Sequence, residues 1–133
     1  MNKTVTLASF ALRIAGVGAL ALGLALWSGR LYDWLGLHMA LGLVVVLAVW
    51  TVSAFGLLQE NLRGRAALLF VLGLAVLGLG VTQTGLLPGP AHWVIRAIHL
   101  LLGLGALGLG EILAKRLRMS VQRATKAASA ASS

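Results

Sequence analysis

The stretch Leu37-His38-Met39-Ala40-Leu41-Gly42-Leu43 recurs in the same pattern as Ile98-His99-Leu100-Leu101-Leu102-Gly103-Leu104. Both stretches read aliphatic-His-x-x-Leu-Gly-Leu, and each lies inside a long apolar segment. A histidine is costly in such a segment and is usually retained for a function. On an α-helix, residues four apart lie on the same face, one turn apart. Each stretch therefore presents an imidazole with a side-chain-free notch beside it.

The composition around these stretches is that of an integral membrane protein. Of the 133 residues, 59% are hydrophobic and 11% are charged, whereas a soluble domain has about 25% charged residues. The chain has no cysteine, which excludes disulfides, thiolate metal sites and covalent attachment of a c-type haem. The formal net charge is +8. Because the basic residues sit at the ends of the apolar segments, they signal topology and argue against a nucleic-acid partner.

Four apolar segments are long enough to cross a lipid bilayer, which takes about 20 residues. They cover approximately residues 7–27, 31–58, 66–87 and 91–113. The short connections make consecutive helices antiparallel neighbours. We therefore predict an all-α membrane protein, with an up-down bundle of four transmembrane helices over residues 1–119. The first apolar run is longer than the roughly 7–15 residues of a signal peptide core, so we interpret it as a true span.

The chain also has the pattern of a tandem repeat of two helices. Besides the histidine stretches, Ile14-Ala15-Gly16 corresponds to Val71-Leu72-Gly73, and Leu22-Gly23-Leu24 corresponds to Leu79-Gly80-Val81. A tandem pair of spans keeps its orientation when it is repeated. The two histidine-bearing segments are therefore expected to run in the same direction.

The distribution of lysine and arginine predicts that both termini are cytoplasmic. Eight basic residues lie on the side of the termini, and only Arg30 and Arg96 lie on the other side; an excess of positive charge marks the cytoplasmic side. The eight are Lys3, Arg63, Arg65, Lys115, Arg116, Arg118, Arg123 and Lys126. Residues 120–133 form a basic, Ala/Ser-rich cytoplasmic tail. It could extend the last helix along the anionic cytoplasmic leaflet, although a weakly structured end is the simpler interpretation.

The two histidines are predicted to face each other across the bundle. His38 and His99 each lie seven or eight residues from the outer end of their segment, which is about 10 Å below the outer surface. The second and fourth helices of a square bundle are diagonal, and bundle cofactor sites use side chains from facing helices. Two axial imidazoles suit the iron of one haem b, because the porphyrin supplies the other four nitrogens. We therefore predict His38 and His99 as the metal ligands.

The residues around the histidines are consistent with that prediction. Gly42 and Gly103 remove side chains one turn from the ligands and leave room for a flat ring. Arg30 and Arg96 are placed to pair with the haem propionates through charge-assisted hydrogen bonds. Further glycines of the first and third segments are expected at the ring edges: Gly16, Gly23, Gly73 and Gly80.

Other interpretations of the polar residues stay open. The two histidines could serve helix packing through hydrogen bonds, or each could singly bind another metal or a chlorophyll-like ring. His92 fits an interfacial residue, and Arg13 with Glu111 fits an ion pair between adjacent helices. Gln83 could line a pocket for a quinone head group, although packing hydrogen bonds are the simpler interpretation.

The four-span layout and the two His-x-x-Leu-Gly stretches resemble the small bacterial four-helix b-type cytochromes of the cytochrome b561-like group. The resemblance implies that His38 and His99 ligate haem in a bacterial inner membrane. It also implies that electrons pass to or from a quinone or a partner redox protein. Dihaem members of that group use four histidines. No histidine lies toward the cytoplasmic side here, so the resemblance extends to one haem near the outer face.

Three functions are compatible with this sequence. The first is a monohaem membrane cytochrome, which is an electron-transfer protein or subunit rather than a stand-alone enzyme. The alternative is a cofactor-free accessory or structural subunit of a larger membrane complex. A small transporter built from the repeat is disfavoured, because the broken helices and polar midplane residues that transport uses are missing from the sequence.

Overall fold

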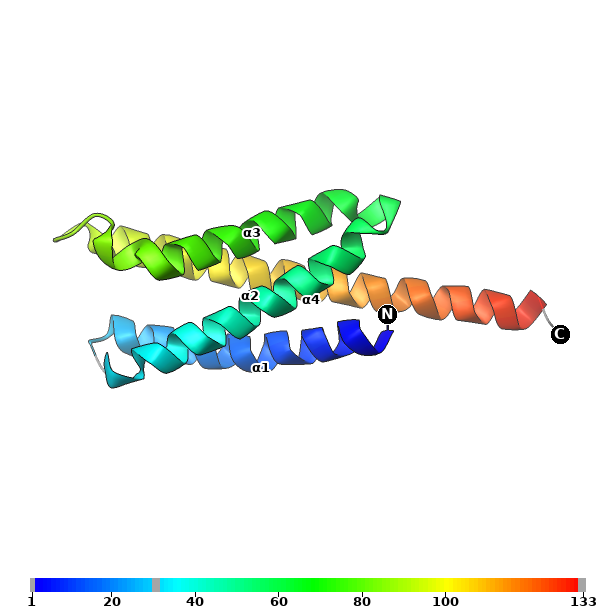
Figure 1. The fold of residues 1–133 in the computed structure, drawn as a ribbon, viewed down its shortest axis with the longest axis horizontal. Coiled ribbons are helices and arrows are strands. Elements are labelled where there is room, and N and C mark those ends of the chain that lie inside the picture. Colours follow the sequence, from blue (N-terminus) through cyan, green and yellow to red (C-terminus); the bar gives the residue numbers. More distant parts are fainter. Residues whose placement is uncertain (1, 30–31, 132–133) are drawn as a thin grey trace.

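The structure, a computed structural model, describes residues 2–29 and 32–131. Within these residues it contains four long α-helices (Figure 1), which confirms the predicted all-α four-helix bundle. They are α1 (Asn2–Trp27), α2 (Leu35–Leu57), α3 (Arg63–Thr82) and α4 (His92–Ala131). Short 3₁₀ turns lie in the connections at Tyr32–Trp34, Glu60–Leu62 and Gln83–Gly85.

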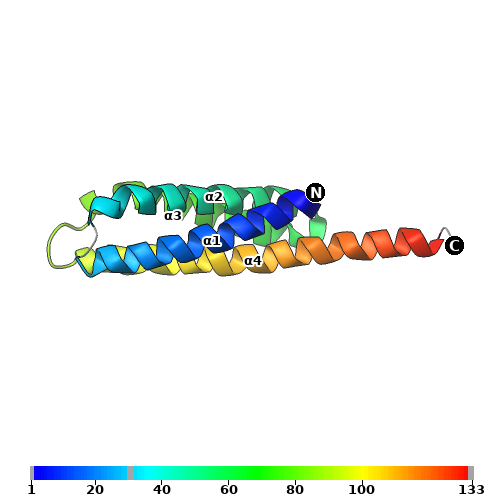
Figure 2. The same cartoon turned by 90° about the horizontal axis from the view of Figure 1, so that it is seen from below.

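The helices form a closed ring in chain order. Each helix packs against the next, and α1 also packs against α4. Of the two diagonals, the one between α2 and α4 is the closer. Figures 1 and 2 show both chain ends on one side of the bundle, with the α1–α2 and α3–α4 connections on the opposite side. We call these sides the terminal end and the loop end.

All four helices are long and apolar enough to cross a membrane. The outward face of α1 illustrates the surface that they present, since Leu7, Phe10, Ile14 and Val17 are each more than 60% exposed. A contiguous apolar face of this size is unusual on a soluble monomer and matches a hydrocarbon environment. The chain is therefore a candidate multi-pass membrane protein.

The ends of the third segment and of the tail show how the helix bounds differ from the sequence prediction. The third segment is predicted to reach Leu87, but α3 ends at Thr82 and a 3₁₀ turn follows. Of the two interpretations of the tail, the structure has the helical one, since α4 continues without a break to Ala131. Residues 120–131 contain no glycine or proline and include five alanines, Arg123 and Lys126, all of which are strong helix formers. Ser120 also accepts a hydrogen bond from the Gln59 side chain at 3.1 Å, which ties the tail's first turn to the α2–α3 connection.

The interior of the bundle is packed at the terminal end and open at the loop end. Apart from Ile95, the buried residues of the four helices fall within 5–16, 45–56, 66–76 and 106–117. Because neighbouring helices are antiparallel, these ranges lie side by side at the terminal end. Among the described residues, none between Gly16 and Val45 is buried, and only Ile95 is buried between Val76 and Ala106. Four helices thus continue into the loop end without filling the space between them.

Arg13 and Glu111 form the predicted ion pair between α1 and α4. The Arg13 guanidinium donates to Glu111 Oε2 from Nε at 2.9 Å and from a terminal nitrogen at 2.6 Å. Ser9 donates its hydroxyl to the other carboxylate oxygen at 3.0 Å. The Arg13 side chain is 59% exposed and that of Glu111 is 29% exposed, so the pair lies at the surface of the spans rather than in the cavity.

Removing either partner of this ion pair is expected to destabilise the bundle, and removing Arg13 should destabilise it more than removing Glu111. Arg13→Ala leaves the partly enclosed Glu111 carboxylate with Ser9 alone, whereas Glu111→Ala leaves an arginine that can extend its long side chain toward the interface. A charge inside an apolar span needs a partner, and removing both charges removes that need. Thermal unfolding in detergent should rank Arg13→Ala lowest, then Glu111→Ala, with the double variant above Arg13→Ala. Equal unfolding temperatures for both single variants and wild type would show that the pair is not stabilising.

Candidate functional site

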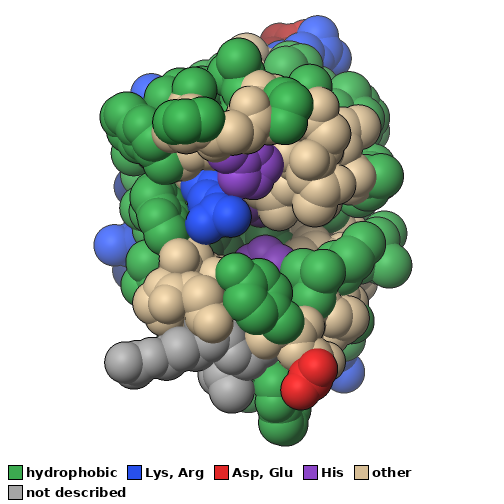
Figure 3. All heavy atoms as spheres, turned by 90° about the vertical axis from the view of Figure 1, so that its left-hand side faces the viewer, with side chains coloured by type: hydrophobic (Ala, Val, Ile, Leu, Met, Phe, Trp, Pro, Cys, Tyr) green, Lys and Arg blue, Asp and Glu red, His purple; other side chains and the backbone are tan. Residues whose placement is uncertain are grey.

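A cavity of about 550 Å³ occupies the open half of the bundle. Side chains of all four helices line it, and the lining is mainly aliphatic. Figure 3 views the loop end and shows a hollow with histidine and basic side chains at its walls. Ligand sites are typically cavities of about 300–1,000 Å³ with apolar walls and a few converging polar groups. The cavity has the size and lining of such a site.

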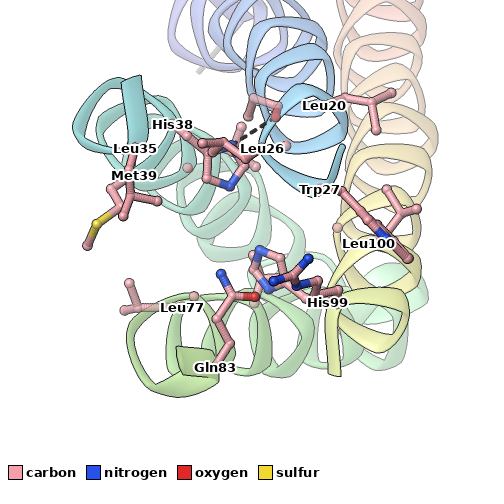
Figure 4. Close-up of a pocket in the computed structure, with 18 of the residues that line it drawn as sticks. Leu20, Leu26, Trp27, Leu35, His38, Met39, Leu77, Gln83, His99 and Leu100 are labelled. Carbon is pink, nitrogen blue, oxygen red and sulfur yellow. Dashed lines mark hydrogen bonds between the residues drawn. The ribbon is translucent and has the colours of Figure 1, made fainter. Parts of the chain in front are cut away.

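His38 of α2 and His99 of α4 enter this cavity from opposite walls (Figure 4). Their ring centroids are 6.4 Å apart and their planes are inclined by 63°. An imidazole nitrogen binds a metal such as zinc at about 2.0–2.1 Å, and the ring centre lies about 1 Å further back. Two imidazoles on opposite sides of one metal therefore have centres about 6 Å apart. The observed separation fits one metal between the rings.

The His38 ring is fixed by a hydrogen bond to α1. Its Nδ1 lies 3.0 Å from the Ala19 carbonyl oxygen. A carbonyl oxygen only accepts, so Nδ1 carries the proton and Nε2 of the neutral ring keeps its lone pair. Metal-binding histidines are usually oriented by such a bond from the second ring nitrogen. His38 is thus held in the form that can bind a metal through Nε2.

The His99 ring has no such bond. Its Nδ1 is buried and lacks a hydrogen-bond partner among the described residues. A buried polar atom without a partner costs about 1–3 kcal/mol, so its presence in a folded protein calls for an explanation. His99 therefore lacks the interhelical hydrogen bond that a packing histidine makes and also the orienting bond that His38 has.

A glycine lies behind each histidine at equivalent positions of the repeat. A Cβ added to Gly23 of α1 would lie 3.1 Å from His38 Cε1, and a Cβ added to Gly80 of α3 would lie 3.5 Å from His99 Cε1. The missing side chains let each ring lie against the neighbouring helix. The contact is tighter for His38 than for His99.

Gly42 and Gly103, which the sequence placed one turn from the histidines, both line the cavity. A Cβ added at either position would meet no atom within 4 Å. Their missing side chains therefore add directly to the open volume between α2 and α4.

Two other glycines serve helix packing instead of the ring edge. A Cβ on Gly73 would lie 2.6 Å from the Trp50 ring nitrogen, and Gly73 does not line the cavity. The prediction for Gly73 was therefore wrong, because the Trp50 indole fills the space beside it. Gly16 lies at the inner end of the cavity, but its α-carbon faces the Leu107 side chain.

Polar side chains gather toward the loop end of the cavity. Arg96, one turn before His99, lines the wall, and so does Gln83 in the 3₁₀ turn that follows α3. His92 also lines it, while its Nδ1 lies 3.0 Å from the carbonyl oxygen of Leu86. Arg30, the second predicted partner for an anionic group, lies outside the described residues. The structure thus brings one of the two predicted arginines to the site.

The two histidines are too few to bind a bare metal ion, and they suit a metal whose other ligands come from a cofactor. No group of three or more His, Cys, Asp or Glu side chains suited to a bare metal ion occurs among the described residues. Two opposed imidazoles match an iron that already has four porphyrin nitrogens. The residues present therefore fit a haem better than a protein-bound metal ion.

Comparison of the chain with protein-family models, with curated proteins and with solved structures gives no match. The functional argument therefore depends on the site itself. Sequence reasoning missed Ala19, because a carbonyl oxygen carries no side-chain signal. It also missed the difference between the two histidines, since their sequence motifs are the same.

Proposed function

We propose that this chain is a membrane b-type cytochrome that holds one haem between His38 and His99. The observation that supports it most is the pair of imidazoles 6.4 Å apart in the open half of an otherwise packed bundle. A haem supplies reversible one-electron chemistry at its iron. The chain's own residues bind it, orient it and set its surroundings.

Different residues of the cavity would bind the haem, orient its ligands and set its surroundings. His38 and His99 would hold the haem iron through their ring nitrogens, and the Ala19 carbonyl orients the ring of His38. Arg96, and Arg30 by its place in the sequence, would pair with the propionate carboxylates of a bound haem. The aliphatic walls keep water from the ring, and burial of this kind is one of the factors that set a haem's reduction potential.

The position of the site determines what the protein exchanges electrons with. We place the termini in the cytoplasm of a bacterium and the site near the outer face of its inner membrane, in a bundle built by duplication of two helices. One haem near one face does not span about 30 Å of hydrocarbon. The protein therefore passes electrons to or from a quinone or a partner redox protein on that side, in the manner of the cytochrome b561-like group that it resembles.

Haem titration of the purified protein tests this proposal. The detergent-solubilised chain is mixed with haem b, and the stoichiometry and the reduced-minus-oxidised absorption spectrum are recorded. We expect one haem per chain with a low-spin, six-coordinate spectrum, which the double variant His38→Ala/His99→Ala abolishes. The matched control is Leu47→Ala/Leu101→Ala, which changes lipid-facing residues of the same two helices. A helical wild-type protein that takes up no haem would refute the proposal and favour the cofactor-free accessory subunit.

The glycines behind the histidines give a paired prediction. Gly23→Ala places a methyl group against the fixed His38 ring, whereas Gly80→Ala gains only an ordinary contact with His99. We expect Gly23→Ala to weaken haem binding about tenfold, as for the loss of an orienting interaction of a metal ligand. Gly80→Ala should change it less. Haem titrations of both variants measure the difference, and a larger loss for Gly80→Ala would contradict the geometry.

A further inference from the structure

The two histidines occupy equivalent places in the repeat but are held unequally. Gly16 corresponds to Gly73 and Gly23 to Gly80, so Ala19 corresponds at the same spacing to Val76. His38 donates to the carbonyl of Ala19. The corresponding bond from His99 to the carbonyl of Val76 is missing, and His99 Nδ1 has no other partner among the described residues.

Contacts with the neighbouring helices show the same inequality. The ring of His38 lies so close to α1 that a Cβ at Gly23 would be 3.1 Å from it, and the corresponding distance from Gly80 to His99 is 3.5 Å. His38 is thus fixed by one hydrogen bond and lies closer to its neighbouring helix than His99 does. His99 has a looser contact and no hydrogen bond.

An orienting hydrogen bond strengthens a metal–histidine bond in two ways. It fixes the ring in the productive direction, and it makes the opposite nitrogen more basic. Loss of such a partner typically lowers metal affinity by about 10–100-fold. If both histidines ligate the same iron, the bond to His99 is therefore the weaker one.

We propose that His38 is the permanent ligand and His99 the exchangeable one, so that the site binds a small neutral ligand, such as carbon monoxide, on the His99 side. This inference rests on the proposed haem site and adds a second binding function to it. In the exchange, the bond from the metal to His99 Nε2 breaks and the incoming donor atom supplies the replacing electron pair. No electron is gained or lost, and His99 keeps its lone pair.

The cavity provides the space that this exchange needs. A displaced His99 ring must move away from the metal, and the helix behind it offers no side chain at Gly80, where an added Cβ would lie 3.5 Å from His99 Cε1. The surrounding walls are largely aliphatic. Apolar walls disfavour a charged ligand that arrives without a partner, which is why a neutral ligand is expected.

Single histidine variants test the inequality in the full-length protein with haem b. His99→Ala should keep haem within about tenfold of the wild-type affinity and change to a five-coordinate spectrum that shifts when carbon monoxide is added. His38→Ala should lose at least about tenfold more affinity than His99→Ala. Leu101→Ala, a lipid-facing change on α4, is the control and should keep the wild-type spectrum. Equal losses for both histidine variants, or a larger loss for His99→Ala, would overturn the inference while leaving the haem site in place.

A measurement without haem separates the two proposals. In nitrogen-15 spectra of the histidine-labelled, haem-free protein, His38 should show one tautomer with a slowly exchanging proton on Nδ1. His99 should show both tautomers or fast exchange. The same tautomer and the same exchange rate for both rings would overturn the inference that His38 is oriented by a hydrogen bond and His99 is not. A wild-type protein that takes up no haem would overturn the haem site and, with it, the exchange.

Discussion

Replacing Gly42 and Gly103 together by leucine is expected to raise the unfolding temperature of the haem-free protein and to weaken haem binding strongly. Both glycines line the cavity, and a side chain at either position would project into open space. Two leucines would fill the gap between α2 and α4 with favourable van der Waals contacts. The same atoms would occupy the volume that the ring needs.

The size of each effect follows from the packing. Removing a glycine from a helix interior contributes about 0.8–1 kcal/mol per position, before any gain from filling the cavity. Overpacking costs about 1–3 kcal/mol for each inserted side chain, and 1.4 kcal/mol is a factor of about ten in affinity. With two inserted leucines we expect haem affinity to fall by roughly two powers of ten. Thermal unfolding without haem and haem titration measure the two changes.

The control for this variant uses two other glycines of α4. Gly105 and Gly108 also have open space around them, but they are exposed on the outer surface and do not line the cavity. Gly105→Leu/Gly108→Leu gains the same helix propensity without filling the site, so haem binding should be unchanged. If the Gly42/Gly103 variant binds haem as the wild type does, the cavity is not where haem sits.

Sequence periodicity was sufficient to predict how the histidines lie. Residue counting put His38 and His99 at one depth, and the square bundle put their helices on a diagonal. The structure has the rings 6.4 Å apart. These relations depend only on helix rise and connection order, which are nearly the same in every such bundle.

The open half of the bundle could not be predicted from the same reasoning. Periodicity shows which residues share a face, but whether two facing surfaces meet depends on how the helices diverge. Glycine identity was equally ambiguous. Gly73 makes room for the Trp50 indole, while Gly42 faces empty space, although both are helical glycines in apolar segments.

The histidine surroundings show a second limit. The duplicated motifs predict two equal ligands, because each motif specifies only its own helix. The orienting partner of His38 is a carbonyl of a different helix, and the distance to that carbonyl depends on the separation of two helix backbones. A small difference in that separation is enough to make or lose a hydrogen bond. Functional inequality between repeats can therefore arise without any difference in the motif.

Gly56 is expected to give the opposite result from Gly42, although both belong to α2. Gly56 lies in the packed half, where an added Cβ would be 2.8 Å from the Ala66 Cβ and 3.0 Å from a Leu113 methyl group. A side chain can change its rotamer, but a Cβ is fixed by its backbone, so α2 and α3 would have to separate. Overpacking costs about 1–3 kcal/mol and occasionally more, and we expect Gly56→Leu to reach or exceed the upper value.

Gly56→Ala is the more demanding test, because helix propensity and packing predict opposite effects. Alanine is the better helix former by about 0.8–1 kcal/mol, but the clash of its Cβ should nevertheless lower the unfolding temperature. Gly64→Ala on α3 is the matched control, since its added methyl group meets no atom within 4 Å and should not destabilise the protein. Thermal and denaturant unfolding in detergent measure all three variants. If Gly56→Ala were as stable as Gly64→Ala, the packed half would be looser than described. The two ends of the bundle would then not differ enough for the open half to indicate a binding site.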